Sequence, residues 1–268
     1  MNDRTGTRNF CALVIAVLLP AWTLGALAQE KSPAPVRKER IYVRDLEGIW
    51  VNNAYLKELA TTKSPHAAAK KAPPVVIAIK REGPSYPVVV TNFDKATLRV
   101  VLDLEPFGKP NAFRLVLGVE NRPTTSADAT YLPFEGVKGP QGKFETLKFS
   151  EQGFMKGKPA DYTRIAGEIS PHVNRAVIAG KYADDKGRAW TFAESGEAVW
   201  PDQKMNYEIS LNDPGASCEY FHYEDATSGE KKRYGFTWKA GKLQIFAAKL
   251  VDKKVRCDAK PIVVLTQQ

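Results

Sequence analysis

Polar and hydrophobic residues alternate through most of the stretch from Gly180 to Ala248. In one segment Tyr234, Phe236 and Trp238 share a face, opposite charged and polar neighbours. A period of two residues is typical of a strand with one buried face, and short turn signals separate the segments. The pattern therefore predicts a β-meander. Its strands are expected at Gly180–Asp184, Arg188–Phe192, Ala198–Trp200, Lys204–Leu211, Cys218–Glu224, Arg233–Lys239 and Lys242–Ala248.

The same period of two extends through the N-terminal half, from Val75 to Val119. The segment Leu98–Leu104 carries aliphatic residues at every second position with charged residues between them, which predicts one apolar face. That face consists of Leu98, Val100, Leu102 and Leu104. No βαβ unit is apparent, so antiparallel pairing is expected. The predicted strands are Val75–Lys80, Tyr86–Asn92, Leu98–Leu104 and Ala112–Val119, with a last strand at Pro261–Thr266.

Short helices are predicted at three places. A strand ending at Val51 is followed by a helical pattern with Asn53 as its cap, and Ser64 and Pro65 begin a second helix. A third begins at Ser170 and runs toward Val177.

Residues 121–160 predict long loops, with Tyr131–Phe134 and Lys143–Phe149 as the strand-like pieces. Such a region forms either the mouth of a cavity or a variable surface connection.

The fold class expected is all-β, an antiparallel meander that closes into a barrel. Residues 41–268 are expected to form a single barrel-like domain, with a subdivision near residues 165–178 left open. The tripeptide Ser-Pro-His occurs at Ser64 and at Ser170, but the same offset applied to Gly48–Trp50 reaches Phe154–Lys156. The pattern therefore predicts no internal repeat.

The N-terminus has the pattern of an export signal. Arg4 and Arg8 precede an apolar run that ends in Ala26-Leu27-Ala28, a small-x-small cleavage pattern. Residues 1–28 are therefore expected to be a signal peptide and residues 29–40 a flexible lead-in, with Gln29 as the first mature residue. An uncleaved anchor is the alternative, and no transmembrane segment is expected after signal removal. The predicted location is periplasmic or secreted.

The mature chain keeps two cysteines, Cys218 and Cys257. An even, small number of cysteines in an oxidising compartment predicts one disulfide, and two separate thiols are the alternative. Closing this loop would restrict the unfolded chain by roughly 4 kcal/mol in the chain-entropy model.

The formal net charge of +9 makes the protein basic. The basic clusters are short, which is typical of solvated rims or guarded strand edges, and export argues against a nucleic-acid partner. A weak contact with an anionic envelope surface stays open.

Residues that could carry catalysis are scattered. His66, His172 and His222 are far apart in the sequence, and none has another His, Cys or carboxylate at the spacing of a metal site. No nucleophile-elbow, phosphate-binding or dinucleotide motif occurs. The acidic pairs Asp184–Asp185 and Glu224–Asp225 lie at expected turns. The sequence therefore predicts no catalytic residue, metal or cofactor, and a protein that is not an enzyme.

Gly48 and Trp50 on the first strand resemble the G-x-W signature of lipocalins, whose tryptophan closes one end of an eight-stranded barrel. The resemblance implies a lipocalin-like protein, as found among secreted bacterial proteins. The chain departs from that pattern because a helix follows the first strand and because Pro261–Thr266 offers no arginine to stack on Trp50.

The first hypothesis is an exported, non-enzymatic binding protein that holds a small apolar or amphipathic ligand inside the barrel. The alternative is that the aromatic residues fill the barrel and that the protein is an envelope interaction or inhibitor module without an internal ligand. The candidate ligand-binding residues are Trp50, Trp190, Tyr220, Tyr234, Phe236 and Trp238.

Overall fold

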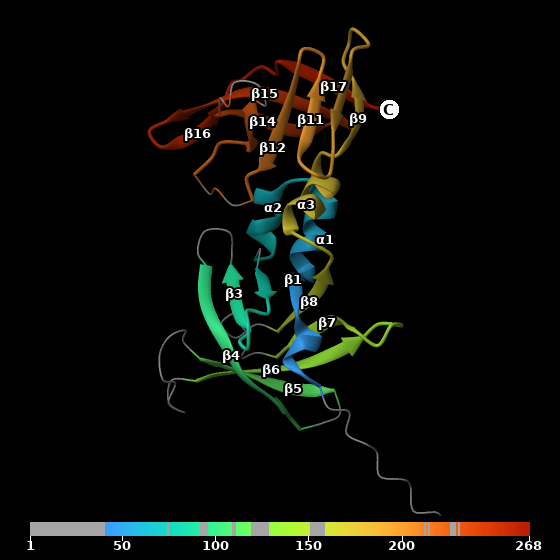
Figure 1. Cartoon of the computed structure of the whole chain (residues 1–268). Helices are drawn as coiled ribbons and strands as arrows, with labels where there is room; N and C mark the ends of the chain where they lie inside the picture. The colour runs from blue at the N-terminus through green and yellow to red at the C-terminus, as the bar shows by residue number, and fades with distance from the viewer. Residues whose placement is uncertain are drawn as a thin grey trace, which may run out of the picture. The chain divides into compact units, whose positions relative to one another are not determined.

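The computed structural model describes most of the chain after residue 40. The described residues are 41–73, 75–91, 96–108, 111–118, 129–150, 159–211, 213, 215–225, 229 and 231–268. The expected signal peptide and lead-in, residues 1–40, lie outside them. The expected all-β antiparallel fold is confirmed, because the described residues form two closed antiparallel barrels and three short α-helices (Figure 1).

The first barrel, called barrel 1 below, is built from β1 to β8 in chain order. Strand β1 pairs with both β2 and β8, which closes the sheet. Its strands are β1 Gly48–Asn52, β2 Val76–Ile79, β3 Pro87–Thr91, β4 Ala96–Pro106, β5 Ala112–Gly118, β6 Thr130–Lys138, β7 Phe144–Phe149 and β8 Ala160–Ile165.

The second barrel, called barrel 2, contains the predicted meander and closes through pairing of β14 with β15 and of β17 with β9. Strand β16 pairs with β15 as an additional hairpin, which the alternation did not predict. The strands are β9 Gly180–Ala183, β10 Ala189–Phe192, β11 Glu197–Trp200, β12 Gln203–Ile209, β13 Glu219–Asp225, β14 Lys231–Lys239, β15 Lys242–Val251, β16 Lys254–Cys257 and β17 Val263–Gln267.

Both barrels belong to one compact unit of the chain, Glu39–Gln268. The sequence favours one barrel-like domain here and leaves a subdivision near residues 165–178 open. In the structure, β8 ends at Ile165 and β9 begins at Gly180, so the passage from one barrel to the other falls in this interval.

The helices begin close to their predicted residues. Helix α1 (Asn53–Thr62) is capped by Asn52, one residue earlier than predicted, because the Asn52 side chain accepts the N–H groups of Ala54 and Tyr55. Helix α2 (Pro65–Lys71) is capped by Ser64, as predicted.

Helix α3 (Ile169–Val177) begins one residue before the predicted start, and its cap residue Glu168 makes no side-chain capping bond. A short 3₁₀ helix, η1 (Val43–Leu46), precedes β1.

The predicted apolar face of β4 is wrong at Leu98 and Leu102, which are 41% and 49% exposed, whereas Val101 is buried. A register shift between Val101 and Asp103 in the pairing with β5 explains this, because an extra residue reverses which side chains face the barrel interior. Leu104 packs against the barrel 1 core as predicted.

The prediction of long loops between residues 121 and 160 needs correction as well. The two strand-like pieces belong to β6 and β7, and β8 begins at Ala160. Pro133 lies within β6 and Gly136 within its pairing with β7, so these residues weakened the strand signal. Residues 121–128 and 151–158 of the expected loop lie outside the described part.

Two hydrophobic cores hold the structure together. One fills barrel 1 around Trp50, Phe134 and Leu147. The other fills barrel 2 and continues into the helices through Tyr55 and Leu59 of α1. Each fully buried Leu or Phe side chain contributes about 1.5–3 kcal/mol relative to an exposed one.

The predicted disulfide is confirmed and joins Cys218, just before β13, to Cys257 at the end of β16. It passes directly over Gly235 of β14. A Cβ at Gly235 would overlap the Sγ atom of Cys257 and lie 3.2 Å from that of Cys218. Glycine is therefore needed here for close approach of the bridge to the strand.

Gly235→Ala is expected to destabilise the oxidised protein by about 1–3 kcal/mol, because the new methyl group overpacks against the bridge. The same substitution in a Cys218→Ala/Cys257→Ala background should cost much less. Chemical unfolding of the four proteins measures the difference. An equal cost in both backgrounds would show that the disulfide does not set the requirement for glycine.

Candidate functional site

The six candidate ligand-binding residues do not lie in one place. Trp50 belongs to the core of barrel 1, whereas Trp190 and Phe236 are buried in barrel 2. Tyr234 and Trp238 are partly buried against the same barrel 2 core. Tyr220 alternates with the inward Phe221 on β13, so its ring lies on the outer face of the barrel.

Aromatic rings occupy the interior of barrel 2 by contacting one another. The ring centroids of Trp190 and Trp200 are 4.6 Å apart, and those of Trp200 and Tyr234 are 4.8 Å apart. Phe221 continues the series, 5.9 Å from Tyr234 and 6.2 Å from Phe236. These are the separations of packed aromatic pairs. Trp200 and Phe221 were not among the candidates, although the alternation of β11 and β13 carries the signal for both.

Trp238 connects β14 to the helices. Its Nε1–H donates to the carbonyl of Val177 in α3 at 2.8 Å. The ammonium of Lys63, just after α1, lies 4.0 Å from the ring centroid, which is a cation–π contact. Trp238 therefore has a structural role in the described contacts.

Trp50 is fully buried in the core of barrel 1. Its Nε1–H donates to the carbonyl of Leu46 at 2.9 Å, and the guanidinium of Arg164 lies 5.4 Å from its ring centroid. Gly48 permits this arrangement, since a Cβ there would come within 2.8 Å of Arg164 Nε. Pro261–Thr266 has no arginine that could stack on Trp50. Arg164 of β8 takes that position instead, because β8 is the last strand of the barrel that contains Trp50.

Barrel 2 begins in a similar way. Gly180 and Tyr182 occupy the places of Gly48 and Trp50, and both glycines have positive φ, 156° and 147°. The Tyr182 hydroxyl donates to the carbonyl of Ile178 at 2.7 Å, again four residues earlier in the chain. The two barrels therefore share a local arrangement at their first strands, at an offset different from that of the Ser-Pro-His tripeptides.

Comparison of the chain with protein-family models, with curated proteins and with solved structures found no match. The antiparallel barrels are consistent with a lipocalin-like barrel.

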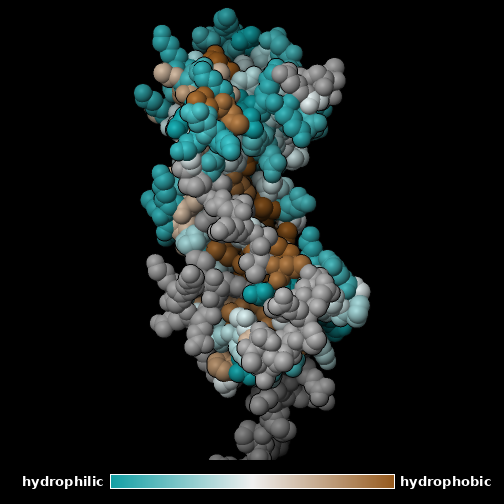
Figure 2. All heavy atoms as spheres, turned by 90° about the vertical axis from the view of Figure 1, so that its left-hand side faces the viewer, coloured by the Kyte–Doolittle hydropathy of each residue, from teal (hydrophilic) through white to brown (hydrophobic). Residues whose placement is uncertain are grey.

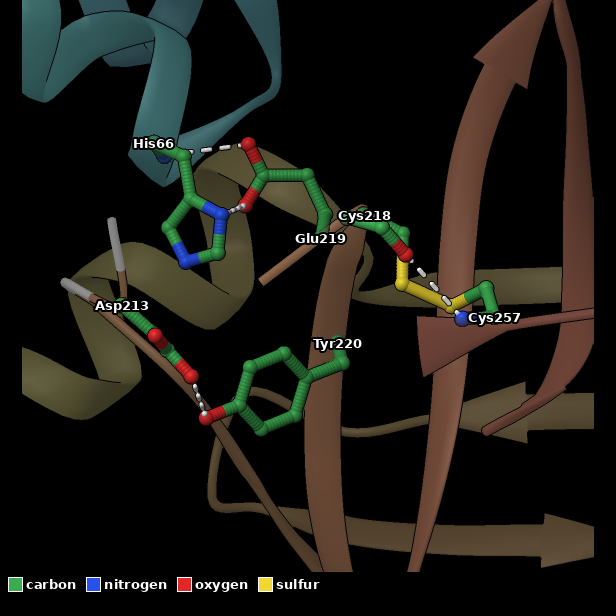
Figure 3. Close-up of a disulfide and its surroundings, with 7 residues drawn as sticks. His66, Asp213, Cys218, Glu219, Tyr220 and Cys257 are labelled. Carbon is green, nitrogen blue, oxygen red and sulfur yellow. Dashed lines mark hydrogen bonds and ion pairs between the residues drawn. A yellow bond between two sulfur atoms is a disulfide. The ribbon is translucent and has the colours of Figure 1, made fainter. Parts of the chain in front are cut away.

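A buried polar cluster joins α2 to β13, and Figure 3 shows it beside the disulfide. Glu219 Oε1 accepts the Ser64 hydroxyl and the His66 backbone N–H, the latter at 3.0 Å, while Oε2 lies 3.4 Å from His66 Nδ1. The His66 and Glu219 side chains are 14% and 11% exposed. Burial raises the pKa of Glu219, and His66 and Ser64 oppose that shift.

Tyr220 extends this cluster on the other side. Its hydroxyl donates to Asp213 Oδ2 at 2.9 Å, and its ring centroid lies 6.2 Å from that of His66 and 5.2 Å from that of His222 (Figure 3 shows the Asp213 contact and His66). Tyr220 and His222 share a face of β13, because side chains two residues apart on a strand point the same way.

Ser64 donates its hydroxyl to the Glu219 carboxylate, which also lies against His66, so one buried acid holds the first turn of α2. His66 Nε2 is buried and has no hydrogen-bond partner among the described residues. The cluster attaches α2 to barrel 2.

Metal-ligating side chains do not converge in the part of the chain that the structure describes, where no group of three His, Cys, Asp or Glu residues could hold an ion. His172 Nε2 lies 2.9 Å from the carbonyl of Ala166. None of the described helices is long and apolar enough to cross a membrane. The disulfide is compatible with an extracellular or periplasmic protein.

Asp184, the first residue of the acidic pair Asp184–Asp185, stabilises the turn between β9 and β10. Its carboxylate accepts the N–H groups of Lys186 and Arg188, the Arg188 guanidinium and the Trp190 indole N–H. Burial acts to raise its pKa, but these hydrogen bonds outweigh burial and lower the pKa to about 2. Glu224 forms an exposed ion pair with Lys231 at 3.7 Å.

The lowered pKa of Asp184 predicts a pH-dependent contribution to stability. The pKa of Asp184 is about 2 in the folded protein and 3.8 ordinarily. Ionised Asp184 therefore stabilises the fold at pH values above 3.8, and this stabilisation is lost as the pH falls from 3.8 toward 2. Asp184→Asn should therefore lower stability at neutral pH, and its difference from wild type should narrow in acid. Urea unfolding at several pH values measures this, with the exposed neighbour Asp185→Asn as control. A difference that does not change with pH would contradict the assignment.

Proposed function

We propose that this chain is an exported, non-enzymatic binding protein that recognises another envelope protein through its outer surface. The observation that carries the proposal is the packing of barrel 2, where the rings of Trp190, Trp200 and Tyr234 contact one another in sequence. Rings at van der Waals distance leave no space between them for a ligand. We therefore prefer the surface-interaction hypothesis to an internal small-molecule site.

The interior of barrel 1 supports the same conclusion. Phe134 lies 5.8 Å from Phe113 and 5.6 Å from Phe149, measured between ring centroids. Phe149 in turn meets Tyr162 edge-on at 5.4 Å. All four side chains are at least 92% buried. The aromatic residues of this barrel thus pack as a core as well.

An aromatic and basic group on the outer face of β4–β6, called the β4–β6 patch below, suits protein recognition. It consists of Phe107, Arg114 and Tyr131. The Arg114 guanidinium lies 5.6 Å from the Phe107 ring centroid and 4.8 Å from that of Tyr131, and it pairs with Glu105. Phe107 and Tyr131 remain 45% and 40% exposed. Figure 2 shows further hydrophobic residues, in brown, among hydrophilic ones on the face it presents.

The composition of the β4–β6 patch favours a protein partner, since Tyr, Phe and Arg are enriched at protein interfaces. The whole chain has a formal net charge of +9 and stays basic when Asp3, Arg4 and Arg8 are lost with the signal, which favours a partner with an acidic surface, because opposite charge accelerates association. The contact between Trp50 and Arg164 supports placing barrel 1 among lipocalin-like proteins, and the N-terminal pattern supports export.

The packed-core part of the proposal is tested by titrating a fluorescent fatty-acid analogue into the mature protein. We expect no saturable one-to-one binding. Phe236→Ala should lower the free energy of unfolding by about 3–5 kcal/mol, because it removes a buried ring from a filled core. Saturable binding by wild type that weakens in Phe236→Ala without loss of stability would instead support the carrier hypothesis.

The surface part is tested with a photoreactive residue placed at Tyr131, compared with one at Val199, which is 47% exposed on β11. In cells of the source organism, a defined adduct is expected from position 131 and not from position 199. The partner so identified, once purified, should bind Tyr131→Ala more weakly by roughly 1–3 kcal/mol. Equal binding of wild type and Tyr131→Ala would exclude the β4–β6 patch as the interface.

A further inference from the structure

A cleft of about 390 Å³ opens at the end of barrel 1 where β1 begins. Three segments that are distant in the sequence form it: η1 with the residues after it, the turn from β6 to β7, and β8. A volume in this range accommodates a small molecule rather than an isolated water. The described residues that line the cleft are Arg44, Asp45, Glu47, Lys138, Gly142, Lys143, Phe144 and Arg164.

The lining of the cleft is cationic. Four basic side chains face two carboxylates, which leaves a net of two positive charges. One of those carboxylates is engaged locally, because Asp45 Oδ2 accepts the backbone N–H of Tyr42 at 2.9 Å. Phe144 is the one hydrophobic residue among the lining residues that the structure describes. Such a cleft selects ligands by charge rather than by apolar area.

The cationic groups are held by ordered structure on two sides. Arg164 is half-buried, stacks on Trp50 and directs Nη1 to the carbonyl of Phe144 at 3.5 Å. The turn that carries Lys138 and Lys143 is closed by two backbone hydrogen bonds of 2.9 Å, from Gly139 N–H to the Lys143 carbonyl and from Gly142 N–H to the Gly139 carbonyl. Gly142 has a φ of 73°, which a glycine adopts without strain. Arg164 and the backbone of this turn are therefore ordered before an anion binds, which lowers the entropic cost of binding.

We propose that this cleft binds the phosphate group of a small phosphorylated compound or of a phospholipid headgroup, with Arg44 and Lys143 as direct ligands. Guanidinium groups match phosphate oxygens with paired hydrogen bonds, and lysine supplies a point charge. The volume exceeds that of a phosphate ion alone, so the bound compound carries a further polar moiety of modest size. This site is separate from the β4–β6 patch, and its test does not depend on that proposal.

The test uses the mature protein with inorganic pyrophosphate in calorimetry, and vesicles of phosphatidylglycerol or phosphatidylcholine in a flotation assay. Lys143→Gln and Arg44→Gln are each expected to weaken binding roughly tenfold, the scale of one charge-assisted hydrogen bond. Lys239→Gln, at an exposed lysine that ends β14, is the matched control and should leave binding unchanged. Binding should also weaken as ionic strength rises from about 0.01 to 0.15 M.

Weaker pyrophosphate binding by the two cleft variants supports the site and indicates that its ligand is a soluble phosphorylated compound. Weaker binding of the same variants to phosphatidylglycerol vesicles, with the control unaffected, supports the site and indicates that its ligand is a lipid headgroup. The proposal is overturned if wild type binds neither probe, or if Lys239→Gln weakens binding as much as Lys143→Gln. Circular dichroism of each variant checks that the barrels remain folded.

Discussion

Burial of the apolar faces of the three short helices is the interaction on which the rest of the structure depends. Tyr55 and Leu59 of α1 are fully buried in the core that also fills barrel 2, and Val51 and Val76 of barrel 1 contribute to the same core. An isolated helix of this length is marginal in water, so tertiary packing provides its stability. The helical insertion between β1 and β2 thus brings Val51 and Val76 of barrel 1 into the core of barrel 2, beside the separate core of barrel 1.

Polar contacts around this core give the helices a defined position. Trp238 and Val177 join β14 to α3, and Glu219 holds both Ser64 and His66 of α2. Taking Glu219 out of water is costly, which is why burial raises its pKa and why several donors surround it. A hydrophobic surface alone would allow the helices to slide, whereas these hydrogen bonds fix one arrangement. The disulfide beside them restricts the same end of β13.

Filled barrels have a functional consequence. When aromatic rings satisfy one another's packing, as Trp190, Trp200 and Tyr234 do, the interior gains stability and loses capacity for a ligand. The recognition that we propose then occurs at the surface. The β4–β6 patch offers aromatic area around a cation, and the cleft at Arg44 and Lys143 offers positive charge in a concave setting. These are different chemical environments on one barrel, and each suits a different class of partner.

Local patterns in the sequence determined much of the secondary structure. Alternation predicted the strands of the meander, Ser64 and Pro65 predicted the start of α2, and the two cysteines predicted the bridge, because each depends on residues close in sequence or on simple counting.

Tertiary structure alone decided how many barrels the chain closes, since closure depends on pairing between distant strands such as β1 with β8. It also decided the bulge at Val101–Asp103 and the partner of Trp50. Arg164 lies 114 residues beyond Trp50 in sequence, and barrel closure brings them into contact. Periodicity shows which side chains face inward, but the register between strands decides which of them meet.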